Sequence, residues 1–578
     1  MSTPPSTRRN STLVASGILL SRVSGLVRQR AFGHFFGTGG MADAYTAAFR
    51  IPNLMQNLLG EGVLSASFIP VHSRLLKEGR TEEAGRVAGA VAGLLALLAG
   101  VITLIAVVFA DPLTSLLAPG FSGARRDLTV TLVRVLTPGV GFLVLSAWCL
   151  GVLNSHRRFF LSYVAPVLWN VVQIVVLVGT AVVVLDDPLA VSGAAPDALE
   201  TLLVALGIGT LIGGLAQFLV QVPTVRRLEP GLRLSLRRDL PGVRSTIRAF
   251  GPVVAGRGVV QLSAYLDLFL ASLLVEGAVA ALGFAQVLYL LPVSLFGMSV
   301  AAAELPELST ADHDDKVALG RRLDTGLARI GFYVLLSAIV LVVVGDLAVG
   351  TLFRSGDFGR DSELVVWAIL IAYGVALLPI TSSRLLQSAL YGVGDTKTPA
   401  RIAVVRVVVS ATVGLLVMFP LDRLAIVDGG IDQTASLFVF GPLPLGVREA
   451  ADTVRLGAMG LAIGGAIGAW VEYRALRRAV AETFEVRTQV AGQARGHLVL
   501  PAVAAVVTGL LMRPVVADWP RLLGGPLAIG AVALAYVLVA ARTRVDEVDD
   551  VRRAVGAVTG RLGTISRLQR SQRRRRNQ

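Results

Sequence analysis

SRVSGLVRQRAFGHFFGTGGMADAYTAAFRIPNLMQNLLGEG, residues 21–62, places charged side chains in sequence that is otherwise apolar enough for a membrane. Apolar runs precede it at 13–20 and follow it at 63–70. A charge at bilayer depth costs about 3 kcal/mol on insertion scales, so such residues normally face a protein interior or a water-filled cavity and mark a pathway. The candidates for a functional site in this stretch are Arg22, Arg28, Arg30, Asp43, Arg50 and Glu61.

The arginines of this stretch suggest a binding site for an anion. Arg22 and Arg28 are six residues apart, which places them about 120° apart around the axis of one helix. Their two guanidinium groups are expected near one polar face. The guanidinium fork matches the oxygens of a phosphate-like anion. One alternative is that Arg28 and Arg30 only anchor a helix end at the membrane surface. A second is that the arginines pair with acidic residues and only hold helices together; these residues are Asp43, Glu61, Asp267, Glu304 and Glu307.

Composition indicates a polytopic membrane protein. The chain has 578 residues, of which 54% are hydrophobic and only 16% are charged. Apolar windows of about 20 residues, the length needed to cross a bilayer as a helix, recur throughout the chain. No room is left for a large domain outside the membrane. The net charge of +15 is concentrated in connections and the tail, so we predict no nucleic-acid partner.

We predict an all-α fold with fourteen transmembrane helices, because runs of this length satisfy their own backbone only as helices. The predicted segments are 11–36, 42–71, 87–110, 127–154, 159–185, 199–225, 246–275, 278–305, 326–353, 362–390, 399–420, 454–473, 496–516 and 523–541.

Lysine and arginine are concentrated in every second connection, which places most of them on one side of the membrane. With the amino terminus placed inside, the inner connections and termini hold 37 of these residues and the outer connections hold nine. This bias predicts a multi-pass membrane protein with both termini in the cytoplasm. The basic tail, 542–578, is expected to be attracted to anionic lipids of the inner leaflet.

No catalytic, cofactor or metal site is predicted from motif spacing. The single cysteine, Cys149, lies in an apolar run and is expected to be a packed core thiol. The five histidines show no ligand spacing, which argues against zinc or haem: His34, His72, His156, His313 and His497. A membrane prenyl transferase needs clustered carboxylates for Mg²⁺, yet the Asp pairs at 186–187 and 549–550 have no partner at bilayer depth. We therefore predict a protein that is not an enzyme.

A weak internal repeat predicts two lobes. Residues 49–74 and 288–310 each begin near a proline, continue with small residues and end in an apolar-Pro-x-x-Ser pattern. Parallel repeats of six helices would place a site between the lobes around a central cavity; chance similarity between apolar helices is the alternative. The predicted parts are an N-lobe (1–225), a cytoplasmic connector (226–245), a C-lobe (246–473), two extra helices (474–541) and the basic tail (542–578).

Several motifs resemble the MurJ/MviN family of lipid II flippases, in the multidrug/oligosaccharidyl-lipid/polysaccharide exporter superfamily. They are spread over nearly the whole chain, and fourteen helices with both ends inside is the topology of that family. The motifs are SRVSGLVRQ, FGTGGMADAYTAAFRIPN, GEGVLSASFIPV, AFGPVVAGRGVVQLSAYLDLFLASLL at 249–274, LPELS at 305–309 and RLLQSALYGVGDTKTPARIA at 384–403.

The resemblance implies the site residues one by one. Positions matching cavity residues of the family are Arg22, Arg28, Asp43, Asn53, Glu61 and Arg384. The chain departs from the family at Gln56, where many members have an arginine, and at Gln286 and Val287, where many have an Asp-Arg pair. We add Arg257 as a hypothesis of our own, because it could restore the missing positive charge. Asp267 matches an acid of a proposed ion site, but the partner asparagine is replaced by Gly414, which puts ion coupling in doubt.

The resemblance also implies the substrate: undecaprenyl-pyrophosphate-linked disaccharide pentapeptide, moved from the inner to the outer leaflet by alternating access. Cations would compensate the pyrophosphate in a cavity of low dielectric constant. The alternative is a flippase or exporter of another polyprenyl-linked saccharide or of a multidrug-type substrate. The expected partners are this lipid and the membrane lipids, and the resemblance implies the bacterial cytoplasmic membrane as the location. We expect a monomer, leave partners among the cell-wall synthesis proteins open, and expect no cofactor.

Overall fold

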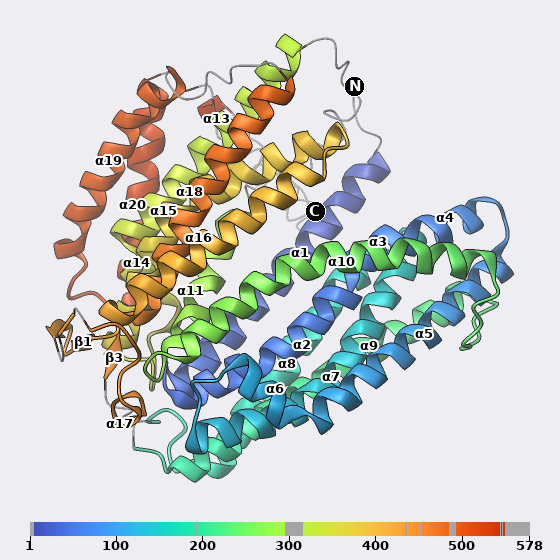
Figure 1. Ribbon diagram of the computed structural model, residues 1–578, viewed down its shortest axis with the longest axis horizontal. Helices are drawn as coiled ribbons and strands as arrows, with labels where there is room; N and C mark the ends of the chain where they lie inside the picture. Colours follow the sequence, from blue (N-terminus) through green and yellow to red (C-terminus); the bar gives the residue numbers. More distant parts are fainter. Residues whose placement is uncertain are drawn as a thin grey trace, which may run out of the picture. The chain divides into compact units, whose positions relative to one another are not determined.

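The structure is a computed structural model built almost entirely of helices (Figure 1). It describes residues 5–191, 193–294, 316–433, 436–437, 439–449, 453–484, 493–543, 545 and 547–549. Within these ranges nine helices contain a segment long and apolar enough to cross a membrane. They are α5 (Thr81–Val108), α7 (Gly123–Ser155), α8 (Phe159–Val184), α9 (Pro196–Leu228), α13 (Lys316–Val343), α15 (Arg360–Gly392), α16 (Lys397–Leu421), α19 (Gln493–Val515) and α20 (Arg521–Arg542).

The other helices differ more in length. They are α1 (Pro5–Phe36), α2 (Gly40–Leu59), α3 (Glu61–Ser67), α4 (Ile69–Lys77), α6 (Ala110–Leu117), α10 (Pro241–Ser272), α11 (Ala278–Pro292), α14 (Gly345–Phe353), α17 (Leu445–Arg448) and α18 (Gly457–Phe484). Each of the fourteen predicted segments overlaps at least one helix, so the helical membrane fold is confirmed. The count of fourteen spans stays a prediction.

The predicted segment 42–71 is not one helix. It is divided among α2, α3 and α4, and α2 ends where Gly60 adopts an extended conformation, with φ −88° and ψ −154°. A Cβ atom at Gly60 would lie 2.2 Å from the carbonyl oxygen of Gln56, so only glycine fits this bend. Pro70 then occupies the first turn of α4, where its missing amide hydrogen is not needed. Glycine and proline therefore explain why one apolar run gives three helices.

Contacts divide the chain into two compact units with boundaries different from those of the predicted lobes. Unit 1 comprises Met1–Phe284, Leu352–Ile369 and Val413–Leu461. Unit 2 comprises Ala285–Thr351, Leu370–Thr412 and Ala462–Gln578. The lobes and the internal repeat stay a prediction, because compactness does not test pseudo-symmetry.

Unit 1 is a bundle in which α7 packs on α2, α5 and α9, while α8 packs on α1 and α9 (Figure 1). The predicted connector after α9 lies against α5. There Gly85, Gly89 and Gly93 recur every fourth residue, and a Cβ atom at Gly89 would lie 2.1 Å from the carbonyl oxygen of Arg233. These glycines let the extended chain approach the helix closely. The start of the connector, including Glu229, is thereby held at the end of the bundle.

Cys149 lies in the core of unit 1, fully buried beside Trp148 and Val152. The predicted core thiol is confirmed. Cys149→Ala should retain the fold and lower the melting temperature by only a few degrees, because it removes one sulfur atom from a packed site. Melting of the purified variant and maleimide labelling of the native wild-type protein check this expectation. Rapid labelling without denaturant would contradict it.

A small antiparallel sheet follows α16, in a connection where no strand was predicted. Its strands are β1 (Leu424–Val427), β2 (Gly430–Gln433) and β3 (Val454–Arg455), in the order β2-β1-β3. Asp428 and Gly429 form the turn between β1 and β2, both with positive φ, at 50° and 79°. This Asp-Gly turn favours a hairpin.

Asp422, directly after α16, gives unit 1 a pH dependence. Its carboxylate is buried and accepts a hydrogen bond from the amide of Val275 at 3.3 Å. Burial raises the pKa of Asp422 to about 7, although Arg455, the Val275 amide, Arg423 and Arg448 oppose the shift. The folded state therefore holds a proton that the unfolded chain, with an ordinary carboxyl pKa, releases. Stability from this group is present at low pH and is lost as the pH rises toward 7.

We accordingly expect the wild-type protein to melt at a higher temperature at pH 5 than at pH 8. The Asp422→Asn variant should lose most of this difference, because its amide is neutral at both values. Asp432→Asn, on exposed β2, is the matched control and should behave like wild type. Equal pH dependence in all three proteins would contradict the assignment.

In unit 2 the two extra helices, α19 and α20, pack on each other and on α13. Tyr536 is fully buried and donates a hydrogen bond to the carbonyl of Phe332 at 3.0 Å. Arg513 lies 2.9 Å from the Asp346 carboxylate and donates to the carbonyl of Val343 at 2.7 Å. The helices predicted as additions to the two lobes are thus fixed to unit 2.

Candidate substrate-binding site

Arg28 is held on α1 by an aromatic side chain of α8. Its guanidinium lies over the Trp169 ring, 5.1 Å from the ring centroid. The Trp169 indole donates to the carbonyl of Thr210 at 3.2 Å and stacks on Phe49 of α2, with ring centroids 6.1 Å apart. A guanidinium on an aromatic face keeps its donors available for a ligand.

Small and polar residues bring α1 close to α8. A Cβ atom at Gly17 would lie 2.8 Å from the Cβ of Tyr163, so the two helices are almost in backbone contact there. Further along, Asn170 donates to the Ser24 hydroxyl at 2.9 Å. This packing sets the position of α1, and with it the position of Arg28 over Trp169.

Neither Arg22 nor Arg28 has an acidic partner in the described part of the chain. Arg22 is exposed on α1, and no ion pair or hydrogen bond engages its side chain there. Arg28 is half-buried, lies over Trp169 and interacts electrostatically with Tyr45, but pairs with no described carboxylate. Arg30 differs, because it donates to the carbonyl of Leu352 at 2.9 Å. The reading in which Arg22 and Arg28 pair with acidic residues to hold helices together therefore finds no support in these contacts.

Asp43, the acidic candidate on α2, is bonded to other parts of unit 1. Its carboxylate lies 3.3 Å from Arg125 of α7, and both side chains are buried. It also accepts hydrogen bonds from the amides of Gly277 and Ala280, at 2.8 and 2.7 Å, at the start of α11. The Arg125 guanidinium additionally lies 4.3 Å from the centroid of the Phe121 ring. Asp43 thus links α2, α7 and α11. The sequence analysis considered such a helix-holding role for Asp43 but did not name Arg125 as its partner.

Asn53 belongs to a polar seam between α2 and α10. Asn57 donates to the Asn53 side chain at 2.8 Å and to the Gln261 side chain at 3.4 Å. Tyr265 of α10 donates to the carbonyl of Arg50 at 2.8 Å. The sequence analysis found Asn53 but missed Asn57 and Gln261, because uncharged amides do not stand out in an apolar helix.

The remaining predicted residues are dispersed. Glu61 is exposed at the start of α3, and Asp267 is half-buried in α10. Arg257 also lies in α10, but its side chain is outside the described part of the structure. Arg384 is exposed on α15, in the part of that helix that belongs to unit 2. Gly414 has no side chain, so it offers no polar ligand for an ion site with Asp267. A Cβ atom there would lie 3.3 Å from the apolar side chain of Leu461.

In unit 2, the buried Glu472 of α18 was missed in the sequence. It pairs with Arg406 of α16 at 2.9 Å and accepts a hydrogen bond from Gln387 of α15 at 3.0 Å. Arg406 is one of the arginines within predicted spans, and this contact explains how its charge is compensated. It therefore differs from Arg22 and Arg28.

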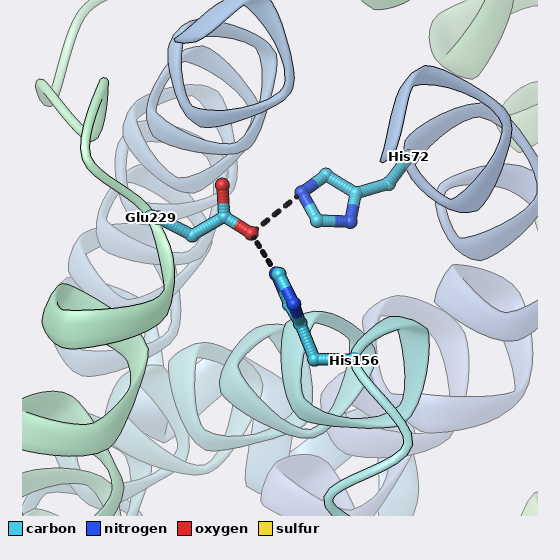
Figure 2. A group of neighbouring side chains, drawn as sticks. All are labelled: His72, His156 and Glu229. Atoms are coloured by element: carbon cyan, nitrogen blue, oxygen red, sulfur yellow. Dashed lines mark hydrogen bonds and ion pairs between the residues drawn. The ribbon is translucent and has the colours of Figure 1, made fainter. Parts of the chain in front are cut away.

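A second group in unit 1, the His72–His156–Glu229 cluster, joins residues far apart in sequence (Figure 2). The Nε2 atoms of His156 and His72 lie 2.6 and 3.0 Å from the same carboxylate oxygen, Oε1 of Glu229. Burial on its own raises the pKa of Glu229, but the two imidazoles outweigh burial and the net pKa is lowered. Spacing along the chain could not reveal this cluster, because its members come from three different elements.

Comparisons with known proteins agree on one family. A family model described as lipid II flippase MurJ matches residues 32–429. A probable lipid II flippase MurJ of Bdellovibrio bacteriovorus is 33% identical over 415 residues, which cover 71% of this chain and 76% of the relative. A lipid II flippase MurJ of Burkholderia cenocepacia is 31% identical over 400 residues, covering 68% of this chain and 75% of the relative.

Solved structures show the same fold. A lipid II flippase MurJ in an inward closed conformation has a TM-score of 0.67 and 19% identity, and the match covers 93% of this chain and 99% of that one. An inward-facing multidrug resistance MATE family transporter of the MOP superfamily has a TM-score of 0.56 and 18% identity, covering 80% and 96%. At these identities a structural likeness supports the fold alone, whereas the family model and the curated relatives decide the family. The chain belongs to the lipid II flippase MurJ family.

Proposed function

We propose that this protein moves lipid II from the inner to the outer leaflet of the cytoplasmic membrane, and that Arg22 and Arg28 bind its pyrophosphate. The single observation that carries the proposal is that these two arginines of α1 have no acidic partner in the described residues, while the nearby acid of the sequence motif, Asp43, is already paired with Arg125. Positive charge is thus left over where the family motif lies. A substrate anion would compensate it.

The geometry of Arg28 suits a pyrophosphate. Its guanidinium rests on Trp169, which limits the side chain to few orientations before any ligand arrives. Less conformational entropy is then lost on binding. Phosphate oxygens accept two parallel hydrogen bonds from one guanidinium, which an ammonium group cannot provide. Arg28 would orient the headgroup, and the exposed Arg22 would add charge. Asn53, Glu61, Arg257 and Arg384 remain proposed contacts.

We further propose that transport proceeds by alternating access, with residues ~11–225 rocking against ~246–473 as is usual for transporters built from repeats. Support comes from the fold, which resembles those of a lipid II flippase MurJ and of a multidrug resistance MATE family transporter. The protein would act as a monomer, with both termini in the cytoplasm.

The test is whether the chain restores growth to bacteria depleted of their own lipid II flippase. We expect the wild-type protein to restore growth, and the doubly substituted Arg22→Ala/Arg28→Ala protein to accumulate in the membrane without restoring it. Lack of growth with a well-expressed wild-type protein would favour another polyprenyl-linked saccharide as substrate. Growth with the double variant would contradict the role of the arginines.

A further inference from the structure

We propose that the His72–His156–Glu229 cluster is a binding site for a first-row divalent transition metal, with Zn²⁺ the best match. The inference concerns one end of unit 1 and does not depend on the proposed transport function. It is based on the geometry of three side chains, one within α4 and two directly after other helices (Figure 2).

The elements converge in a way that fixes all three potential ligands. His72 lies in the middle of α4, His156 directly follows α7, and Glu229 directly follows α9. One ligand atom from each residue lies within 4.8 Å of the others. The side chains of His72 and Glu229 are fully buried, whereas that of His156 is 19% exposed. The cluster is therefore closed on the protein side and open at His156, where a metal could enter and a water molecule could bind it.

Hydrogen bonding leaves part of the cluster unsatisfied. Among the described residues neither ring nitrogen of His72 forms a hydrogen bond, and its Nε2 atom lies 3.0 Å from Oε1 of Glu229 as an ion pair only. Oε2 of Glu229 is also buried and has no hydrogen-bond partner in the described part of the chain. Buried polar atoms are normally hydrogen-bonded, so these orphans require an explanation. A metal ion between the side chains would accept the lone pairs of both residues.

The ligand chemistry selects the metal. Two imidazoles and one carboxylate form the three-ligand set of many zinc sites that keep an open fourth position. Mg²⁺ and Ca²⁺ prefer oxygen ligands, so they match this set poorly. Bonds to Zn²⁺ of about 2.0–2.2 Å place tetrahedral ligand atoms about 3.3 Å apart. Oε1 of Glu229 lies 3.0 Å from Nε2 of His72 and 2.6 Å from Nε2 of His156. The two imidazoles would thus need to move outward from Glu229 by about 0.3 and 0.7 Å.

A bound metal would act as a clip. It would tie α4 to the ends of α7 and α9 and to the start of the connector that runs along the glycines of α5. The competing explanation is a metal-free triad, in which His156 donates a hydrogen bond to Glu229 at 2.6 Å and Nε2 of His72 lies 3.0 Å from the same carboxylate oxygen. The two explanations differ in one measurable property, the affinity of the intact protein for metal.

The experiment uses the purified full-length protein in detergent, without a histidine tag and after removal of metals with a chelator. Zn²⁺ binding is measured by titration calorimetry, and Co²⁺ is added as a spectroscopic probe. We expect one Zn²⁺ per chain, visible d–d absorption of tetrahedral Co²⁺ and a higher melting temperature with Zn²⁺. Glu229→Gln and His156→Gln should each weaken binding at least about 100-fold, more than is typical for loss of a second-shell contact.

His34→Gln is the matched control, because His34 lies outside the cluster and contacts the carbonyl of Pro188 at 3.1 Å. This variant should bind Zn²⁺ like wild type. His156→Gln, at the exposed edge, decides the question if Glu229→Gln does not fold. The proposal is overturned if stripped wild-type protein binds Zn²⁺ no more tightly than His156→Gln, or if Co²⁺ gives no d–d bands.

Discussion

Replacing Arg28 by alanine should abolish lipid II transport while the protein still folds and inserts. The substitution removes the guanidinium that lies over Trp169 and has no acidic partner in the described residues, so no buried acid is left uncompensated. A substrate phosphate that loses its charge-assisted hydrogen bonds loses about 2–5 kcal/mol of binding, or roughly 30- to 4,000-fold in affinity. Lipid II binding by purified protein and growth of flippase-depleted cells measure the effect.

Arg28→Lys separates charge from geometry. Lysine keeps the positive charge but loses the fork and the planar stacking on Trp169, so transport should fall below that of wild type but stay above that of Arg28→Ala. Arg80→Ala is a suitable control, because Arg80 pairs with Glu78 and Glu83 at the protein surface. Wild-type binding by a folded Arg28→Ala protein would show that the headgroup is held elsewhere.

The second large effect is expected at the buried pair of Asp43 and Arg125. Asp43→Ala leaves the Arg125 charge buried and removes the acceptor for the amides of Gly277 and Ala280. Breaking a buried pair in this way costs about 3–5 kcal/mol, a large part of the stability of most folds. Folded yield in detergent and the melting temperature should both fall sharply.

A double variant distinguishes a structural role of Asp43 from the substrate-binding role that the family resemblance implies. Asp43→Asn combined with Arg125→Gln removes both charges and keeps a polar side chain at each position. If the pair is structural, the double variant should recover stability and transport relative to Asp43→Ala. A double variant that folds normally but does not transport would instead show that Asp43 contacts the substrate.

The fold class was predictable because it depends on local sequence. Apolar runs of membrane length form helices whatever they pack against, and each predicted run overlaps a helix in the structure. The errors lie where single residues set a backbone conformation that differs from the average tendency of their segment. Gly60 interrupts a predicted span by bending the chain, and Asp428 with Gly429 makes a hairpin in a connection where no strand was predicted.

The candidate site was only partly predictable, because some of its contacts join residues that are far apart in sequence. Arg22 and Arg28 were found because charge in an apolar helix stands out within a few residues. The partners of Asp43 could not be found that way, because Arg125 and Gly277 are brought to it only by the packing of α7 and α11. The same holds for His72, His156 and Glu229, which no spacing rule connects.

The central claim is that this protein flips lipid II with the arginines of α1. The most direct measurement is the amount of lipid II that an impermeant reagent detects in the outer leaflet of cells depleted of their own flippase. The wild-type protein should restore this signal, and Arg28→Ala at equal membrane abundance should not. An unchanged signal with Arg28→Ala would contradict the assignment of that arginine, and no signal with the wild-type protein would contradict the claim as a whole.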